Sequence, residues 1–326
     1  MTSEANDVTA AAPTVRIGIS SCLLGQKVRF DGGHKRDAFL VDTFGRFVEW
    51  LPVCPEVEAG MGLPREPIRL LRTGSGIRLV GVRTATDHTD AMARVSARRA
   101  EALSREDLDG YILKKDSPSC GMERVKVYDA GGAPTRSGRG VFAEALLARQ
   151  PLLPVEEEGR MSDPRLRDNF VERVFAYRRL RDLFAGRWTV GALVAFHTAH
   201  KLTLLAHSPD TYRSLGPLVA GAASMPRAEV KARYEADFMR GMATLATPRK
   251  HVNVLQHMLG YFRKTLDEQS RAELGAIVAD YQQGLVPLVV PITLFRHHVR
   301  RCGVSYLAGQ TYLEPHPKEL MLRNHV

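Results

Sequence analysis

The chain has 326 residues, of which 44% are hydrophobic and 25% charged, and its formal net charge is +10. This balance is typical of a folded globular protein and excludes collagen-like, low-complexity and disordered chains. The length exceeds the roughly 100–200 residues of one domain, so two domains are predicted. No stretch approaches the roughly 18 uncharged apolar residues of a membrane-spanning helix. Acidic Glu4 and Asp7 stand where a secretory signal carries basic residues, which predicts a cytoplasmic protein.

The positive charge is concentrated in the second half of the chain. Residues 1–160 hold 23 Lys and Arg against 22 Asp and Glu, whereas residues 161–326 hold 23 against 14. Such an excess is typical of proteins that bind polyanions, because Lys and Arg neutralise phosphates and release counterions. A solvated basic surface without a partner gives the same composition.

The first half of the chain alternates between short apolar runs and helical patterns. A leader of a dozen residues precedes the first run, and the alternation predicts an α/β domain with a mainly parallel, Rossmann-like sheet over residues 14–158. The expected strands are Val15–Ser20, Leu51–Val53, Ile77–Val82, Gly110–Leu113, Val125–Tyr128 and Pro151–Val155, and the expected helices are Asp37–Trp50, Thr89–Leu103 and Gly140–Ala148.

From Asp163 onward the apolar period changes to 3.6, which predicts an all-α domain over residues 162–326. Asp163 followed by Pro164 is a typical helix start. The expected helices are Pro164–Phe184, Val190–His207, Ser208–Ala223, Arg227–Ala246, Arg249–Leu266, Ser270–Gln283 and Val290–Arg301.

Three of the four cysteines, Cys22, Cys54 and Cys120, each follow a predicted strand and lie among turn residues. Loops beyond the carboxyl ends of parallel strands meet in one crevice, so these thiols are expected to converge. Their spacing fits no zinc finger or ferredoxin motif. Three thiolates without a fourth ligand suit an iron–sulfur cluster with one open iron, although free cysteines are also commonly buried as small apolar residues.

The same segments resemble a known family. Ser20-Ser21-Cys22-Leu23-Leu24-Gly25, Cys54-Pro55-Glu56-Val57 and Lys115-Asp116-Ser117-Pro118-Ser119-Cys120-Gly121 are similar to motifs of the thiouracil desulfidase (TudS) family. The second half resembles the YbgA-like helical domain through segments around His197–Lys201, Lys250–His257 and Tyr312–Pro317. This fused architecture resembles the RudS type of tRNA 4-thiouridine desulfidase.

The resemblance implies a cofactor and a reaction. Cys22, Cys54 and Cys120 would hold a [4Fe-4S] cluster whose fourth iron binds the substrate sulfur, and water would replace that sulfur without an external electron donor. Glu56, two residues from Cys54, is the expected general base, a role typically worth about 10²–10⁴ in rate. Ser117 is the second candidate, since its hydroxyl would orient the water or the base.

Other residues are expected near the site or in RNA binding. Ser119 is a weaker candidate than Ser117, and Glu58, Lys114, Lys115 and Asp116 are neighbours without distinct roles. Lys35 and Arg36 are placed to meet a nucleotide phosphate, and Cys302 is expected to be structural. In the helical domain, the histidine pairs and the aromatic residues are assigned to a basic surface that grips tRNA rather than to a metal site. These residues are His197, His200, His251, His257, Tyr306 and Tyr312.

Two alternatives stay open at this point. The substrate is either tRNA or free thiouracil and thiolated nucleosides, and a non-catalytic iron–sulfur sensor that binds RNA would use the same cysteines. Retention of Glu56 and Ser117 beside the ligands favours an enzyme, because a sensor needs no proton-transfer pair. Neither a membrane nor an obligate protein partner is expected.

Overall fold

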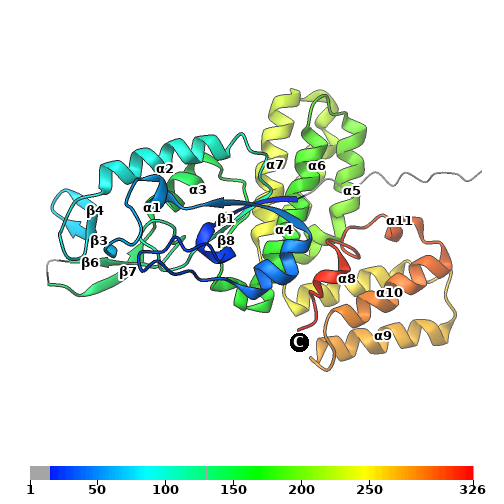
Figure 1. Cartoon of the computed structure of the whole chain (residues 1–326). Helices are drawn as coiled ribbons and strands as arrows, with labels where there is room; N and C mark the ends of the chain where they lie inside the picture. The colour runs from blue at the N-terminus through cyan, green and yellow to red at the C-terminus, as the bar shows by residue number, and fades with distance from the viewer. Residues whose placement is uncertain (1–14, 130, 326) are drawn as a thin grey trace, which may run out of the picture.

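A computed structural model describes residues 15–129 and 131–325 of the chain. The α/β half and the helical half lie side by side, with helix α4 (Pro164–Phe184) at the joint between them (Figure 1). The predicted leader lies outside the described residues. The predicted fold class, an α/β region followed by helices, is confirmed.

The first sheet is parallel throughout and has the order β2-β1-β5-β8. Its central strand β1 (Val15–Ser20) is buried along almost its whole length, since β2 (Val48–Val53) and β5 (Gly110–Leu113) flank it on either side. Strand β8 (Val155–Glu157) adds to the free edge of β5. A continuous apolar run such as Val15–Ser20 is typical of a parallel strand covered on both faces.

A second sheet has the order β4-β3-β6-β7 and is mixed. Strands β3 (Ile68–Thr73) and β4 (Gly76–Gly81) form an antiparallel hairpin, β3 pairs in parallel with β6 (Val125–Tyr128), and β6 pairs antiparallel with β7 (Pro134–Gly138). The sequence predicts neither β3 nor β7. Arg69 and Arg72 interrupt the apolar pattern of β3, and most of β7 is exposed, so neither strand carries a clear apolar alternation.

The helices of the α/β half match the prediction in two places and differ in a third. Helix α2 (Thr89–Leu103) and helix α3 (Val141–Arg149) form as expected. The predicted helix Asp37–Trp50 is wrong, because only short helical turns at Phe39–Thr43 and Phe44–Arg46 form before β2 begins. Trp50 belongs to β2 and lies edge-on to Phe44, with ring centroids 5.7 Å apart, so the chain turns between these residues instead of continuing as one helix.

The last predicted strand of the α/β half also shifts along the chain. The sequence places it at Pro151–Val155, whereas β8 runs from Val155 to Glu157. Pro151 and Pro154 lack the backbone N–H that a strand paired in a sheet donates, which explains why pairing begins after them.

The helical half follows the predicted pattern closely. Asp163 accepts hydrogen bonds from the backbone N–H groups of Arg165 (2.8 Å) and Leu166 (3.1 Å), so it is the N-cap of α4 as expected. The other helices are α5 (Val190–His207), α6 (Pro209–Ala220), α7 (Arg227–Ala243), α8 (Pro248–Gly260), α9 (Glu268–Gln282), α10 (Val289–Cys302) and the short α11 (Ser305–Ala308). No helix within the described part of the chain is long and apolar enough to cross a bilayer.

Helix α4 joins the two halves through apolar and ionic contacts. One hydrophobic core combines Ile17 of β1 with Phe170 and Val171 of α4 and with Leu320 and Leu322 near the end of the described chain. On the same helix, Arg181 Nη1 lies 2.7 Å from Asp109 Oδ1, just before β5, and the Asp109 side chain is fully buried. The α/β half and the helical half therefore share a core instead of meeting through a linker.

Candidate functional site: a cavity lined by three cysteines

A cavity of about 380 Å³ lies at the carboxyl ends of the parallel strands, and Cys22, Cys54 and Cys120 all line it. Cys22 lies in the helical turn Ser21–Leu24 that directly follows β1, and Cys54 comes directly after β2. Cys120 lies in the loop after β5, which turns sharply at Asp116, where φ is +58°. The predicted convergence of the three cysteines therefore occurs in the structure.

Burial controls the protonation of the three thiols. It raises the pKa of Cys22 to about 11, against the opposing effect of the Lys114 ammonium group. Burial also raises the pKa of Cys54 and of Cys120, and the charge of Glu56 adds to the shift at each. Thiolates at these positions thus require a positive partner that replaces the proton, as a bound metal centre does.

The donor set fits an iron–sulfur cluster. Soft thiolates select such clusters, and three cysteines within one cavity leave one iron without a protein ligand. No three His, Cys, Asp or Glu side chains among residues 15–129 and 131–325 are close enough to share a single metal ion. This is compatible with a cluster, because its cysteines bind separate iron atoms and need not meet at one point.

Glu56 is the second residue of the short helix α1 (Pro55–Glu58), which directly follows Cys54. Its carboxylate is held by Arg65, a residue that no sequence motif indicates. Arg65 Nε donates to Glu56 Oε2 at 2.9 Å, and Arg65 Nη2 contacts the same oxygen. Both side chains are largely buried, with 5% of Arg65 and 14% of Glu56 exposed. Arg65 lies in a loop rich in Gly and Pro, where nothing in the local pattern marks it as part of the site.

The second carboxylate oxygen of Glu56 connects to two serines. Ser119 Oγ donates to Glu56 Oε1, and Ser117 Oγ lies 2.9 Å from Ser119 Oγ. The ionised carboxylate of Glu56 can only accept, so Ser119 must donate to it and Ser117 must donate to Ser119. The Ser117 oxygen also accepts from the backbone N–H of Cys120 at 3.1 Å. Ser119, ranked below Ser117 from sequence, is therefore the serine in direct contact with Glu56.

Only some of the charged residues that were expected near the site line the cavity. Lys35, Lys114 and Lys115 line the cavity, and the Lys114 ammonium group lies 2.5 Å from Glu158 Oε1. Arg36 does not line it and pairs with Asp42 at 2.6 Å. Glu58 points away toward α2, where Arg99 donates to both of its oxygens at 2.7 Å.

The histidines of the helical half differ from the predicted basic surface. His197 and His200 are buried, with 4% and 1% of their surface exposed. His197 Nδ1 lies 3.1 Å from the Tyr234 hydroxyl, and Arg179 Nε donates to His200 Nε2 at 3.2 Å. Half-buried His251 bonds the Tyr312 hydroxyl at 2.9 Å. His257 is exposed, so of the four it alone fits the prediction.

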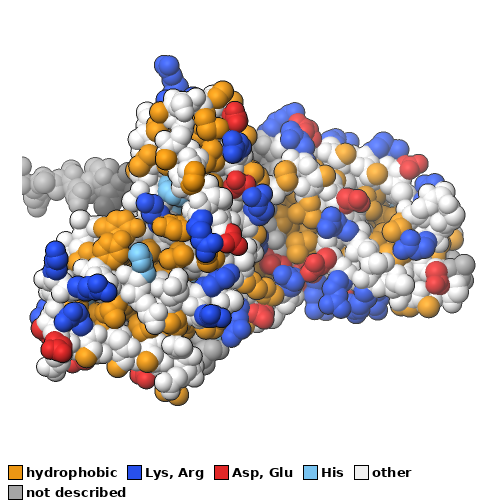
Figure 2. Space-filling model, turned by 180° about the vertical axis from the view of Figure 1, so that it is seen from behind, with side chains coloured by type: hydrophobic (Ala, Val, Ile, Leu, Met, Phe, Trp, Pro, Cys, Tyr) orange, Lys and Arg blue, Asp and Glu red, His pale blue; other side chains and the backbone are white. Residues whose placement is uncertain are grey.

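The aromatic residues assigned to RNA stacking also need correction. Tyr312 is fully buried, so it cannot meet a base, and Tyr306 already stacks on Tyr261 with ring centroids 4.9 Å apart. Cys302 is half-buried at the end of α10 and is not among the residues that line the cysteine cavity. On the face shown in Figure 2, Lys and Arg side chains are spread over both halves.

Comparison with known proteins relates the two halves to separate families. The sequence profile of the 2-thiouracil desulfurase family matches residues 17–158, and that of DUF1722, a family of unknown function, matches residues 201–317. The chain is 34% identical to the uncharacterized protein YbgA of Escherichia coli (strain K12) over 168 residues, which are 50% of this chain and 98% of that protein. It is 30% identical to the uncharacterized protein YbbK of Bacillus subtilis (strain 168) over 153 residues, which are 44% of this chain and 97% of that protein.

One solved structure was also found similar. It is the [4Fe-4S]-dependent thiouracil desulfidase TudS, with 30% identity, a TM-score of 0.38, and coverage of 46% of this chain and 95% of that chain. The two sequence relatives, by contrast, are each matched over almost their whole length. The chain therefore belongs to the 2-thiouracil desulfurase family through its α/β half and to the YbgA-like DUF1722 family through its helical half.

Proposed function

We propose that this protein is an iron–sulfur-dependent desulfidase that removes sulfur from 4-thiouridine in tRNA and releases uridine and hydrogen sulfide. One observation carries the proposal: Cys22, Cys54 and Cys120 line the same cavity as Glu56. Membership of the 2-thiouracil desulfurase family supports the reaction class. The charge excess of the second half supports a polyanionic substrate.

The chemistry divides between the cofactor and the side chains. Cys22, Cys54 and Cys120 would hold a [4Fe-4S] cluster, and its open iron would supply Lewis acidity toward the thiocarbonyl sulfur. Glu56 takes a proton from water as the water oxygen bonds the ring carbon, the carbon–sulfur bond breaks, and the protons of water leave with the sulfur as hydrogen sulfide. No electrons are gained or lost. Arg65 and Ser119 hold the Glu56 carboxylate in place, because each contacts one of its oxygens.

Free thiouracil or a thiolated nucleoside is the second candidate substrate. The cavity of about 380 Å³ is near the lower end of the range for small-molecule sites and would hold the cluster as well, so it suits a substrate no larger than a single base. For tRNA, the thiolated base must first leave its stack, at a cost of roughly a few kcal/mol that phosphate contacts can offset. The two substrates therefore differ in how much they depend on contacts outside the cavity.

The first test uses the full-length protein purified without oxygen. We expect about four irons per chain for a [4Fe-4S] cluster, loss of the thiocarbonyl absorbance of thiolated tRNA, and sulfide release. The variant Cys22→Ala is expected to lose iron, whereas Cys302→Ala keeps it, since Cys302 lies outside the cavity lining. An iron-free wild-type protein, or one whose iron survives Cys22→Ala, would contradict the cofactor assignment.

A second measurement tests the role of Glu56. The variant Glu56→Gln keeps the size and burial of the side chain but cannot accept a proton, so we expect normal iron content and loss of turnover by at least about 10². The matched control is Glu58→Gln, two residues along the same turn, whose carboxylate faces Arg99 instead of the cavity. Normal activity of iron-replete Glu56→Gln protein would refute the assignment.

The preference for tRNA is tested by comparing thiolated tRNA with 4-thiouridine nucleoside across salt concentrations. Turnover of tRNA is expected to fall steeply with salt and turnover of the nucleoside to stay nearly flat. Replacing the exposed residues Arg249, Arg263 and Arg301 by Glu is expected to weaken tRNA turnover and spare the nucleoside. Equal salt dependence for both substrates would favour the small-molecule candidate.

A further inference from the structure

The cysteine cavity contains an aromatic residue to which the proposed reaction gives no role. Phe30 lines this cavity together with Cys54 and Glu56, and among the described residues of the lining no other is aromatic. Phe30 is 36% exposed, so part of its ring is open to solvent. An aromatic ring in the wall of a small-molecule cavity can offer its face to a planar ligand.

The exposure of Phe30 sets it apart from the other phenylalanines. The chain has twelve of them, and all lie within residues that the structure describes. The other eleven belong to the hydrophobic cores of the described residues or pack against them, whereas Phe30 does neither. A phenyl ring that stays in water forgoes the free energy that burial of its apolar surface would supply. Packing within the protein therefore does not explain a phenylalanine at this position.

Backbone hydrogen bonds fix the turn that carries Phe30. The Arg29 carbonyl accepts the Gly32 N–H at 2.9 Å, and the Gly33 carbonyl accepts the Arg29 N–H at 3.2 Å. Gly32 has a φ of +73°, which glycine adopts readily. The Arg29 guanidinium lies 5.2 Å from the centre of the Phe30 ring. The ring therefore projects from a closed turn, and its position is set by the protein.

Arg65 ties this turn to the proposed general base. The Arg65 backbone N–H donates to the Phe30 carbonyl at 2.9 Å. The Arg65 guanidinium donates to Glu56 Oε2 and to the Val28 carbonyl, each at 2.9 Å. One residue thus holds both the turn that carries the ring and the carboxylate. A site that must present a base to a proton acceptor needs such a fixed relation between the two.

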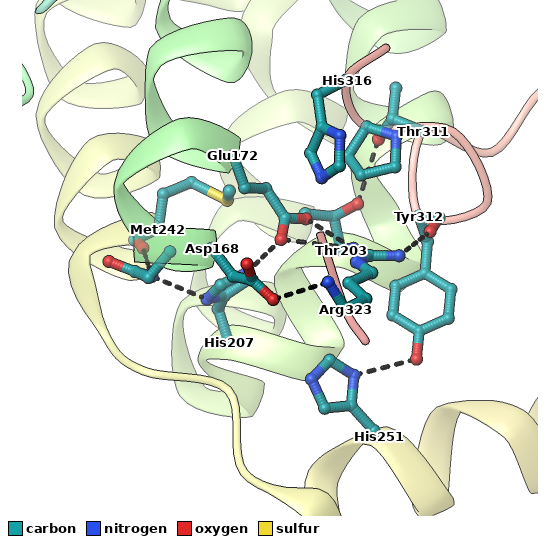
Figure 3. Close-up of polar contacts among 12 residues, drawn as sticks. Asp168, Glu172, Thr203, His207, Met242, His251, Thr311, Tyr312, His316 and Arg323 are labelled. Carbon is teal, nitrogen blue, oxygen red and sulfur yellow. Dashed lines mark hydrogen bonds and ion pairs between the residues drawn. The ribbon is translucent and has the colours of Figure 1, made fainter. Parts of the chain in front are cut away.

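The cavity of about 280 Å³ in the helical half offers no comparable surface. Tyr281 lines it but is only 7% exposed. The ionised groups beside it pair with one another: Glu172 contacts Arg323 and His207, and Asp168 Oδ2 accepts the backbone N–H of Arg323 at 2.8 Å (Figure 3). These groups satisfy one another, and the tyrosine has little open surface for a base.

We propose that Phe30 is the stacking surface for the thiolated pyrimidine, which lies against the phenyl ring with its thiocarbonyl group directed toward Cys22, Cys54 and Cys120. A base turned out of tRNA loses its stacked neighbours, and an aromatic side chain replaces one of them. The inference rests on the proposed desulfidase function and names its substrate class. That class is planar, unsaturated thiolated rings, because a saturated ring or an open-chain thioamide has no flat face to stack.

The first measurement compares turnover of 4-thiouridine by full-length variants. Phe30→Leu keeps an apolar side chain but removes the aromatic face, so we expect KM to rise roughly tenfold with little change in kcat. Phe30→Tyr keeps the face and is expected to behave like the wild type. The matched control, Tyr261→Leu, removes an aromatic residue that is 39% exposed in the helical half and is expected to change neither constant.

The second measurement follows binding without turnover. Calorimetry on full-length Glu56→Gln protein, which is expected to leave the ligand intact, gives the dissociation constants of 4-thiouridine and 5,6-dihydro-4-thiouridine. The dihydro ring is puckered and cannot stack flat. We expect the planar nucleoside to bind at least roughly tenfold more tightly, and Phe30→Leu in the same background to remove most of that preference. A merely structural role of Phe30 would weaken both ligands equally.

The proposal is overturned if 4-thiouridine does not bind, if the planar nucleoside is not preferred, or if a folded Phe30→Leu protein keeps the wild-type KM and ring preference. The ring preference needs no Phe30 variant, so the test stays decisive if Phe30→Leu does not fold. Failure of the desulfidase function looks different: the wild type releases no sulfide, while the preference for the planar ring still depends on Phe30. Normal turnover without any effect of Phe30→Leu would remove the stacking role and leave the desulfidase function standing.

Discussion

At the scale of single residues, the orientation of Glu56 depends on contacts from two directions. Arg65 approaches one carboxylate oxygen, and Ser119 approaches the other. Arg65 Nη2 also donates to the Val28 carbonyl at 2.9 Å, and Val28 lines the cysteine cavity. Arg65 thus links the proposed general base to the loop that carries Val28, which makes it a positioning residue.

Removing Arg65 should destabilise the fold as well as the site. Arg65→Met leaves the largely buried Glu56 carboxylate without its cation, and breaking such a pair costs roughly 3–5 kcal/mol. We expect the free energy of unfolding, measured by urea denaturation, to fall by this amount. Arg136→Met, which breaks a half-exposed pair with Asp116, should cost less than about 1 kcal/mol. Equal losses for the two variants would show that the Arg65–Glu56 pair is not energetically special.

A charge-preserving variant separates positioning from stability. Arg65→Lys keeps a positive charge but cannot place two N–H donors on one carboxylate oxygen from a planar group. We expect it to recover most of the stability lost in Arg65→Met and to keep desulfidase turnover well below that of the wild type. Full recovery of turnover together with stability would mean that charge alone suffices at this position.

Local sequence patterns indicate some of the site residues but not the contacts between them. The cysteines and Glu56 lie in local motifs, so the sequence indicates them directly. The contacts of Arg65 and Ser119 with Glu56 join residues that are 9 and 63 positions apart, and nothing local marks them. For the buried histidines a signal was present: Leu193, His197, His200 and Leu204 recur at helical spacing and are all buried, so the histidines continue an apolar stripe.

At the scale of elements, helix boundaries follow from capping chemistry that the sequence displays. Predicted and observed bounds agree at both ends of α4, where Asp163 and Pro164 mark the start. The prediction misses β3 and β7, because both carry polar residues that disrupt the apolar alternation. Hydrogen bonds to neighbouring strands hold them in the sheet, and such pairing cannot be read from the periodicity of the sequence. Local chemistry therefore predicts the helical half well and the second sheet poorly.

The cap of α4 provides a prediction at this scale. Asp163 accepts two backbone N–H bonds at the start of the helix that joins the two halves. Asp163→Ala is expected to lower the free energy of unfolding by about 1 kcal/mol, and Asp163→Ser to restore most of it, because serine is also a strong N-cap residue. Unchanged stability of Asp163→Ala in urea denaturation would show that the cap contributes nothing to the joint.

At the scale of the whole molecule, four buried or half-buried histidines make the fold sensitive to acid. Burial lowers the pKa of His197 and His316 to about 4 and that of His200 and His251 to about 3. In the unfolded chain they titrate near pH 6.5, so below that pH the unfolded state binds more protons than the folded state. Stability is therefore lost as the pH falls from about 6.5 toward 4.

Each such histidine is expected to lower the free energy of unfolding by up to about 2 kcal/mol when the pH falls from 7 to 5. Burial raises the pKa of Asp168 to about 6, so this carboxyl group takes up a proton in the folded state first as the pH falls. Asp168 alone therefore offsets part of the loss of stability. In urea denaturation at the two pH values, His200→Gln should lose about 2 kcal/mol less than the wild type on acidification. His257→Gln, at an exposed position, should behave like the wild type. Equal stability of the wild type at both pH values would contradict this prediction.

The shared core at the joint has a consequence for how the chain is made. Ile17 of β1 packs in one core with Leu320 and Leu322, which the ribosome adds only after the helices from α4 to α11. During synthesis the apolar face of the first sheet therefore stays partly exposed to solvent until the helical half has been synthesised. Chaperones that hold exposed apolar surface would have their longest opportunity to bind this protein during that interval.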